Sequence, residues 1–180
     1  LKGGKRLRSM IVLDISNSLC KKHKRNIELN DLAISCELIH TISLIIDDLP
    51  CMDNDNIRRN IETIHYKYGV NNAIILSTFI SSKITELLYS NIKKLEKHFQ
   101  EDYINKLRDI LIKNYLENYN TAILGQYVDI YPLKKSKEDN IKFTGNIKDN
   151  YLRKIIIDKT APFFEIAFIG SYLLSGGNID

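Results

Sequence analysis

Four long stretches of the chain place apolar residues at helical spacing. Between residues 31 and 48, apolar side chains recur so densely that we predict a largely buried helix. Asn30 or Asp31 is expected to cap its first turn. A further helix should end at Gly176 and Gly177, because glycine commonly follows the last helical turn. This helix is predicted to span residues 151–174, and two others are predicted over residues 71–98 and 101–131.

Residues that interrupt helices are sparse, since the chain contains only 8 Gly and 3 Pro in 180 residues. This scarcity favours an all-α fold. The lysine-rich stretch "PLKKSKEDNIKFTGNIKDN", residues 132–150, is predicted to form an exposed connection. Pro162 is predicted to kink the last helix, because it cannot donate a hydrogen bond to the carbonyl of Asp158. No internal repeat divides the chain, so we predict one domain over residues 1–180.

Composition and charge narrow the function further. The 44% hydrophobic and 27% charged residues are typical of a globular protein. A net charge of +4, without any nucleic-acid-binding motif, gives no reason to expect a nucleic acid partner. Glu165 interrupts the longest apolar run, so no transmembrane segment is predicted. Cys20, Cys36 and Cys51 lack CxxC spacing and are expected to be reduced thiols.

The segment "SLIIDDLPCMDNDNIRR", residues 43–59, concentrates carboxylates directly behind an apolar run. His40 lies two helical turns before Asp47 and should share its face. Pro50 should break the helix near Asp48, and the irregular turn that follows can bring Asp53 back towards Asp47. Clustered carboxylates without His or Cys ligands suit a hard cation such as Mg²⁺. The alternative for the aspartates alone is a solvated turn with surface ion pairs.

A basic segment, "LKGGKRLR", opens the chain. Its two glycines allow the backbone to approach an anion, and Lys5 and Arg8 lie three positions apart, on one helical face. Arg58 and Arg59 are adjacent, so they point about 100° apart and can serve two different anions. Together the basic and acidic segments suggest two diphosphate groups, one bound through magnesium and one by direct ion pairing.

Four motifs, "GGKRLR", "CELIHTISLIIDDLPCMDNDNIRR", "GQYVDI" and "KT", occur in the order and at about the spacing found in trans-isoprenyl diphosphate synthases. The chain resembles this family over nearly its whole length, and the central stretch is most similar to geranylgeranyl diphosphate synthases of plants and bacteria. The resemblance implies an isoprenoid-synthase-type helical bundle around a central cavity, and a homodimer. It also implies condensation of isopentenyl diphosphate with geranyl or farnesyl diphosphate by magnesium-assisted ionisation.

The resemblance further implies roles for individual residues. Those expected to bind isopentenyl diphosphate are Lys5, Arg8, His40 and Arg59. The expected Mg²⁺ ligands are Asp47, Asp48 and Asp53, and Arg58 is expected to contact the allylic diphosphate. Catalysis at the reacting end of the cavity is expected to involve Asp47, Asp48, Gln126, Lys159 and Thr160. Such a reaction needs no side-chain nucleophile, because magnesium and arginine stabilise the leaving diphosphate.

Product length depends in this family on the wall just before the first aspartate motif. Ile42 and Ser43 occupy the positions five and four before Asp47. Neither is aromatic, so the preferred product is geranylgeranyl diphosphate, with a longer polyprenyl diphosphate as the alternative.

The sequence also departs from the family pattern. Ile46 replaces a histidine, "NIET" at residues 60–63 replaces Gly-Lys-Pro-Thr, and Ser77 and Thr78 replace Gly-Asp. No second aspartate-rich motif is present, so we expect an incomplete chain that lacks the N-terminal helices and the C-terminal part with that motif. Two alternatives therefore stand beside the enzyme. One is a non-catalytic regulatory subunit of a heteromeric prenyl diphosphate synthase, and the other is a terpene cyclase, which has no need of "GGKRLR".

Overall fold

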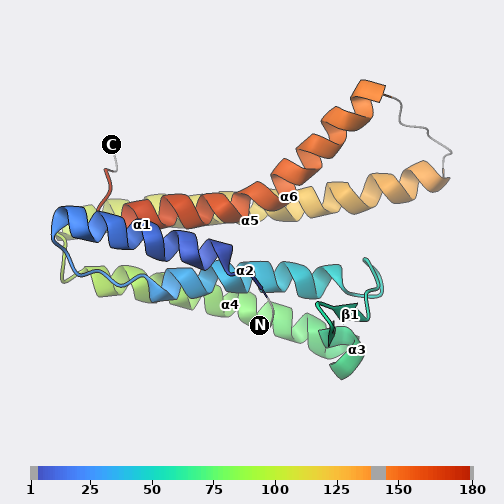
Figure 1. The fold of residues 1–180 in the computed structure, drawn as a ribbon, viewed down its shortest axis with the longest axis horizontal. Helices are drawn as coiled ribbons and strands as arrows, with labels where there is room; N and C mark the ends of the chain where they lie inside the picture. Colours follow the sequence, from blue (N-terminus) through green and yellow to red (C-terminus); the bar gives the residue numbers. More distant parts are fainter. Residues whose placement is uncertain (1–3, 139–144, 179–180) are drawn as a thin grey trace.

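The computed structural model describes residues 4–138 and 145–178, and long helices make up most of this part of the chain (Figure 1). The helices are α1 (Leu7–His23), α2 (Asn30–Asp47), α3 (Ile64–Tyr68), α4 (Val70–Leu95), α5 (Glu101–Glu138) and α6 (Gly145–Leu174). Strands β1 (Ile57–Arg58) and β2 (Ile61–Glu62) form a short antiparallel hairpin. The predicted all-α fold is confirmed, with this hairpin as a small addition.

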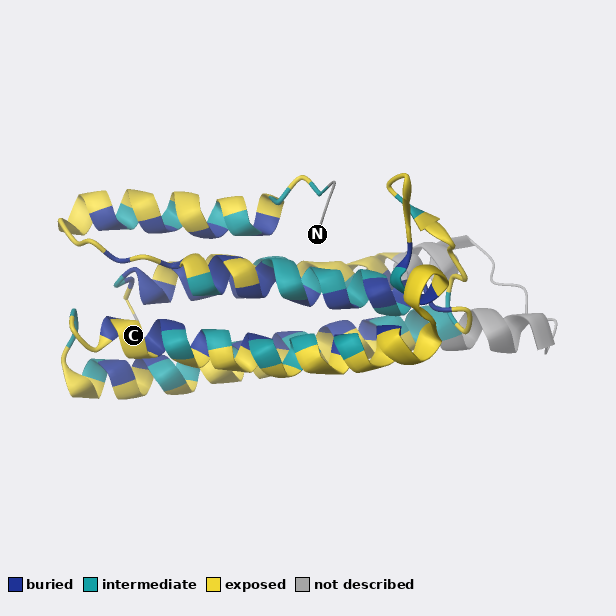
Figure 2. Cartoon of the chain, turned by 90° about the horizontal axis from the view of Figure 1, so that it is seen from below, coloured by how far each residue is buried: buried dark blue, intermediate teal, exposed yellow. Residues whose placement is uncertain are grey.

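Helix α2 lies at the centre of the bundle and contacts α1, α4 and α6, while α5 packs along α6. Buried residues follow the inner faces of the helices, and exposed residues follow the outer faces (Figure 2). Ile39 of α2, Ile84 of α4 and Leu107 of α5 are each no more than 1% exposed. Each such side chain contributes about 1.5–3 kcal/mol through burial. The buried side chains between the helices therefore stabilise the bundle, and α2 packs against neighbouring helices on several sides.

The start of α2 differs from its prediction. Neither Asn30 nor Asp31 caps the helix, because Leu29 occupies the N-cap position and no side-chain cap bond forms there. Instead, the backbone N–H of Leu32 donates to Oδ1 of Asn91 at 2.7 Å. Asn91 belongs to α4 and is fully buried, so a distant polar side chain satisfies this helix end.

The end of α2 agrees with its prediction. The helix stops at Asp47, and a turn follows around Pro50. Within this turn the N–H of Leu49 donates to the carbonyl of Ile46 at 3.1 Å, and that of Asp53 donates to the carbonyl of Asp47 at 2.9 Å. The turn thus returns the backbone of Asp53 to the end of α2.

Helices α5 and α6 are longer than predicted. The stretch 132–150 was expected to be an exposed connection, but α5 continues through Pro132 to Glu138 and α6 begins at Gly145. Lysine and glutamate favour helices, and a single proline removes only one backbone hydrogen bond. Residues 139–144 lie outside the described part.

Two further predictions concern α6. The helix bends in its N-terminal half, as expected from Pro162 (Figure 1). It ends where Gly176 adopts a φ of 86° and the N–H of Gly177 donates to the carbonyl of Tyr172 at 2.9 Å.

Two smaller expectations concern the membrane and the cysteines. Over residues 4–138 and 145–178, no helix has the length and apolar character needed to cross a bilayer. Cys20 and Cys36 are buried free thiols, and Cys51 is an exposed one. The prediction of unpaired cysteines is thus confirmed.

Candidate active site

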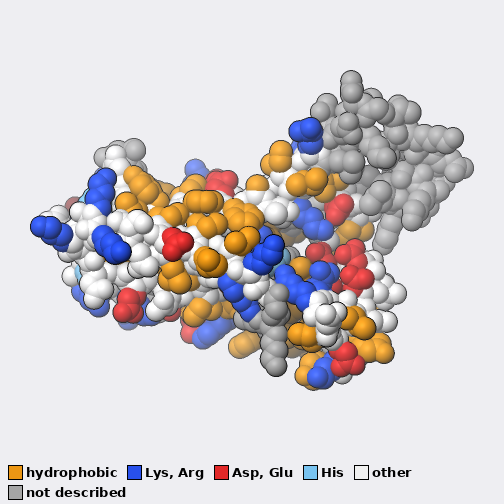
Figure 3. Space-filling view, viewed as in Figure 1, with side chains coloured by type: hydrophobic (Ala, Val, Ile, Leu, Met, Phe, Trp, Pro, Cys, Tyr) orange, Lys and Arg blue, Asp and Glu red, His pale blue; other side chains and the backbone are white. Residues whose placement is uncertain are grey.

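Two adjoining cavities open at the end of the bundle where α2 stops. One is mostly apolar, has a volume of about 660 Å³, and lies between α2, α5 and α6. The other is basic, has a volume of about 710 Å³, and lies between the start of α1, α2, α4 and the hairpin. Arg8, His40 and Leu44 line both cavities. Basic and acidic side chains gather beside each other in this region of the surface (Figure 3).

The basic cavity collects the residues that the sequence predicted for isopentenyl diphosphate. They are Lys5, Arg8, His40 and Arg59, and Arg58 lines the same cavity. Gly4 permits this arrangement, since a Cβ atom there would lie 2.9 Å from Nη1 of Arg59. Arg6 fixes the segment to α2 through a 3.2 Å ion pair with Glu37.

Arg8 and His40 stand at the junction of the cavities. The Arg8 side chain is buried, and its guanidinium lies 4.3 Å from the centre of the Phe164 ring. Within the described part of the chain, Nε of Arg8 has no hydrogen-bond partner. Burial is the main cause that lowers the pKa of His40 to about 4, and the positive charge of Arg8 contributes to the same shift. His40 is therefore neutral at pH 7, and the arginines provide the positive charge.

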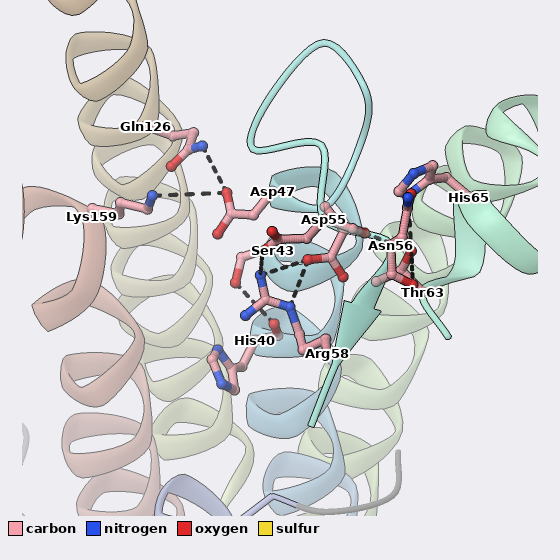
Figure 4. Close-up of polar contacts among 11 residues, drawn as sticks. His40, Ser43, Asp47, Asp55, Asn56, Arg58, Thr63, His65, Gln126 and Lys159 are labelled. Atoms are coloured by element: carbon pink, nitrogen blue, oxygen red, sulfur yellow. Dashed lines mark hydrogen bonds and ion pairs between the residues drawn. The ribbon is translucent and has the colours of Figure 1, made fainter. Parts of the chain in front are cut away.

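Asp48 is held by Arg58. Nε and Nη2 of Arg58 both lie 2.6 Å from Oδ1 of Asp48, and Nη2 lies 3.5 Å from Oδ2 of Asp55 (Figure 4). The hydrogen bond from Arg58 to Asp48 raises the pKa of the guanidinium, so Arg58 stays positively charged. The Thr63 hydroxyl donates to the carbonyl of Asp55 at 2.8 Å and fixes the loop between them.

Asp47 faces the opposite side, towards α5 and α6. Nε2 of Gln126 donates to its Oδ1 at 2.7 Å, and Nζ of Lys159 lies 3.8 Å from the same oxygen (Figure 4). Lys159 also donates to Oδ2 of Asp129 at 3.0 Å. Burial raises the pKa of Asp47, and the charge of Lys159 opposes that shift. Gln126 and Lys159, both distant from Asp47 in sequence, thus meet at its carboxylate.

Helices α5 and α6 approach each other unusually closely beside this group. A Cβ atom on Gly125 would lie 2.6 Å from the backbone N of Lys159 and 3.0 Å from the carbonyl oxygen of Asp158. Only glycine allows this approach without a shift of one backbone. Gly125 therefore sets the position from which Lys159 reaches Asp129 and Asp47.

The predicted magnesium ligands occupy one end of α2, but their side chains point to different partners. Over residues 4–138 and 145–178, no three His, Cys, Asp or Glu side chains are grouped closely enough to hold a metal ion. The donor chemistry nevertheless fits a hard cation. Asp47 and the exposed Asp53 offer carboxylates, and the buried Oε1 of Gln126 has no hydrogen-bond partner among the described residues. Magnesium binding by Asp47, Asp48 and Asp53 stays a prediction.

The remaining predicted residue, Thr160, lines the apolar cavity with Gln126 and Lys159. Sequence reasoning missed Asp129, although its spacing of three from Gln126 places both on one helical face. It also missed Glu37 and Phe164. No local signal pointed to these two, because each acts on a residue of another segment.

Comparisons with known proteins agree with this geometry. The Polyprenyl synthetase family profile matches residues 1–180. Geranylgeranyl diphosphate synthase of Sulfolobus acidocaldarius is 33% identical over 98% of this chain and 47% of its own length. Farnesyl diphosphate synthase of Bacillus subtilis is 40% identical over 50% of this chain and 29% of its own length.

A solved structure is also similar to this chain. Geranyltransferase of Helicobacter pylori, in complex with magnesium and isoprenyl diphosphate, is 30% identical and superposes with a TM-score of 0.71. The match covers 98% of this chain and 53% of that one. This chain thus spans about half or less of the length of these relatives, whose names differ in the product they imply. Because the family profile covers every residue, the chain belongs to the polyprenyl synthetase family.

Proposed function

We propose that the protein is a trans-prenyltransferase that condenses isopentenyl diphosphate with an allylic diphosphate, geranyl or farnesyl, to give a longer polyprenyl diphosphate. The observation that carries this proposal is the pair of adjoining cavities, one basic and one apolar, with Asp47 and Lys159 in the lining of the apolar one. A diphosphate head needs the first environment and a prenyl tail needs the second. The carbons that react would lie where the two meet.

In this proposal the basic cavity binds isopentenyl diphosphate. Lys5, Arg8 and Arg59 supply the charge, and Nε of Arg8, which has no hydrogen-bond partner among the described residues, could donate to a phosphate oxygen. Neutral His40 adds a polar contact without adding charge. An anion beside Arg8 would also offset the cost of burying that guanidinium, which lowers its pKa in the free protein.

The allylic diphosphate would lie at the end of α2, with its tail in the apolar cavity. Asp47, Asp48 and Asp53 would hold magnesium there, and Arg58 would contact the same diphosphate. When bound, magnesium would stabilise the negative charge that develops on the diphosphate as the allylic carbon–oxygen bond breaks. The apolar walls from α2, α5 and α6 would exclude water from the resulting cation until the double bond of isopentenyl diphosphate attacks it. The new cation would then lose a proton to the departing diphosphate.

Two finer features belong to the same proposal. Geranylgeranyl diphosphate is the preferred product, because Ile42 and Ser43 line the apolar cavity and neither is aromatic. The protein is proposed to be a homodimer, and Ile75 and Phe79, one turn apart on α4, are 65% and 64% exposed, which supports a covered apolar face.

The test uses the complete protein with Mg²⁺, labelled isopentenyl diphosphate, and geranyl or farnesyl diphosphate in turn. Products are resolved by chain length, beside the Asp47→Ala, Asp48→Ala double variant. We expect a longer prenyl diphosphate from the unaltered protein and none from the variant. If folded protein makes no product but associates with another synthase chain, the enzyme proposal is wrong and the regulatory subunit is supported. Sedimentation velocity of the same protein tests the dimer.

A further inference from the structure

The β1–β2 hairpin carries Arg58 and Arg59, the two arginines assigned above to different diphosphates, yet little apolar burial holds it in place. Its two large apolar side chains, Ile57 and Ile61, are 65% and 45% exposed. Each strand has only two residues, and a two-stranded hairpin is at best marginally stable by itself in water. Other contacts must therefore fix the positions of the two guanidinium groups.

The tip of the hairpin adds a cost to this arrangement. Arg58 pairs with Ile61, which leaves a two-residue loop between them. In this loop Arg59 has a φ of 53° and Asn60 a φ of 61°. Asparagine tolerates a positive φ, but arginine is strained there, and such a backbone persists only where its surroundings determine it. The conformation of Arg59 therefore also requires an anchor elsewhere in the segment.

Thr63, at the neck of the hairpin, supplies this anchor. It is buried, whereas every residue from Asp53 to Glu62 is half-buried or exposed. Its backbone N–H donates to the carbonyl of Asn56 at 3.0 Å, and its hydroxyl donates to the carbonyl of Asp55 at 2.8 Å (Figure 4). The residue that follows β2 thus closes the chain onto the two residues that precede β1.

His65 completes the anchor from the first turn of α3. It is buried, and its Nδ1 lies 3.1 Å from the Thr63 hydroxyl. The hydroxyl has one proton, which it donates to the carbonyl of Asp55, so Nδ1 of His65 carries a proton and donates to the hydroxyl oxygen. A chain of hydrogen bonds therefore runs from α3 through Thr63 to the loop before β1.

This anchor differs from the other tie between the hairpin and the bundle. Arg58 also holds the hairpin to α2 through Asp48, but the proposed allylic diphosphate would compete for the same guanidinium. The bonds of Thr63 and His65 use neither arginine, and His65 lines neither of the two cavities. The neck of the hairpin therefore stays closed when a diphosphate is bound.

We propose that Thr63 and His65 are positioning residues: their hydrogen bonds at the neck of the hairpin fix its two arginines at the two diphosphate sites. This inference rests on the proposed prenyltransferase function. Because one hairpin carries both arginines, loosening its neck should weaken both sites together. Arg59→Ala, in contrast, should weaken only the basic cavity.

The experiment compares the complete protein with two pairs of variants. Thr63→Val removes the hydroxyl at nearly constant shape, and Thr63→Ser retains it. His65→Gln moves the donor away from the position of Nδ1, and His65→Asn retains a donor there. Thr121→Val, on the exposed side of α5, is the matched control, because it removes a hydroxyl that donates to a backbone carbonyl at 2.8 Å.

Two measurements do not depend on turnover. One is hydrogen exchange of the backbone amides of residues 55–63, and the other is calorimetric binding of inorganic diphosphate, without Mg²⁺ for the basic cavity and with Mg²⁺ for the aspartates. Thr63→Val and His65→Gln should exchange these amides about ten-fold faster and bind diphosphate about ten-fold more weakly in both conditions. Thr63→Ser, His65→Asn and Thr121→Val should stay within about two-fold of the unaltered protein. In turnover, KM should rise for both substrates, whereas a loss of folded protein would lower kcat alone.

Unchanged hydrogen exchange and unchanged diphosphate binding in folded Thr63→Val overturn the proposal. Weaker binding in only one of the two conditions also counts against it, because the hairpin would then not place both arginines. If Thr63→Val does not fold by circular dichroism, the two His65 variants decide by the same criteria. If the unaltered protein makes no product, the proposed function fails, and hydrogen exchange alone decides whether Thr63 and His65 anchor the hairpin.

Discussion

Replacing Gly125 with alanine should separate α5 from α6 next to the reacting groups. The new Cβ would lie 2.6 Å from the backbone N of Lys159, whereas ordinary van der Waals contact begins at 3.4 Å. The helices must therefore move apart by the difference, about 0.8 Å. Because backbone atoms lie on both sides, no side-chain rotation relieves the clash. The 3.0 Å hydrogen bond from Lys159 to Asp129 would be lost or lengthened.

The expected effects on stability and on activity differ in size. Overpacking typically costs about 1–3 kcal/mol, and the better helix propensity of alanine returns about 1 kcal/mol. The net loss of about 0–2 kcal/mol should lower Tm by no more than about 8 °C. Displacing catalytic groups by about 1 Å can lower the rate about 100-fold. We therefore expect a large fall in kcat/KM with a small fall in Tm.

The assay measures prenyl transfer and thermal unfolding of Gly125→Ala beside Gly170→Ala. Gly170 is a matched control on α6, since the nearest atoms to its added Cβ are side-chain ends, those of Leu32 at 3.2 Å and of Leu111 at 3.6 Å. It gains the same helix propensity without a backbone clash. If Gly125→Ala keeps full activity, or if Gly170→Ala loses as much, the argument from close helix approach is refuted.

Two further predictions concern pH and helix capping. The pKa of His40 is about 4 in the folded protein and near 6.5 when unfolded, so the unfolded state binds more protons between these values. Stability should therefore fall as pH decreases from 6.5 to 4, and His40→Gln should flatten this part of a chemical-denaturation series; an unchanged slope contradicts the assignment. Asn91→Ala should lower the free energy of unfolding by about 1–3 kcal/mol, because the N–H of Leu32 loses its buried acceptor. A change under 0.5 kcal/mol, roughly that of a surface substitution, would show that Asn91 does not cap α2.

Local chemistry made some elements predictable from the sequence. The dense apolar spacing of residues 31–48 and the break at Pro50 fixed α2 and its end, because both effects act within a few residues. Helix α1 was missed, because its apolar residues surround the helix and leave Leu7, Met10 and Leu13 exposed. The hairpin was also missed. Arg59 and Asn60 both adopt positive φ there, without the glycine that normally signals such a turn.

In the site, too, features set by neighbouring residues were predictable, and contacts between distant segments were not. Motif spacing predicted that Asp47 and Asp48 would stand together at the end of α2, and they do. It did not predict that they would face opposite partners. Gln126 lies 79 residues beyond Asp47, and its approach depends on how α5 packs rather than on any local pattern. Similarly, Asn91 satisfies α2 from 59 residues away.

The distribution of charge suggests why the two diphosphates would need different treatment. Asp48 is already paired with Arg58, and Asp47 with Lys159 and Gln126, so an anion arriving there meets compensated charges. Lys5, Arg8 and Arg59 form no ion pair within the described residues, so the basic cavity has unmatched positive charge. A diphosphate can enter that cavity without breaking an existing pair. At the aspartates it must bring a cation, because the positive charges of Arg58 and Lys159 are already used to neutralise the carboxylates.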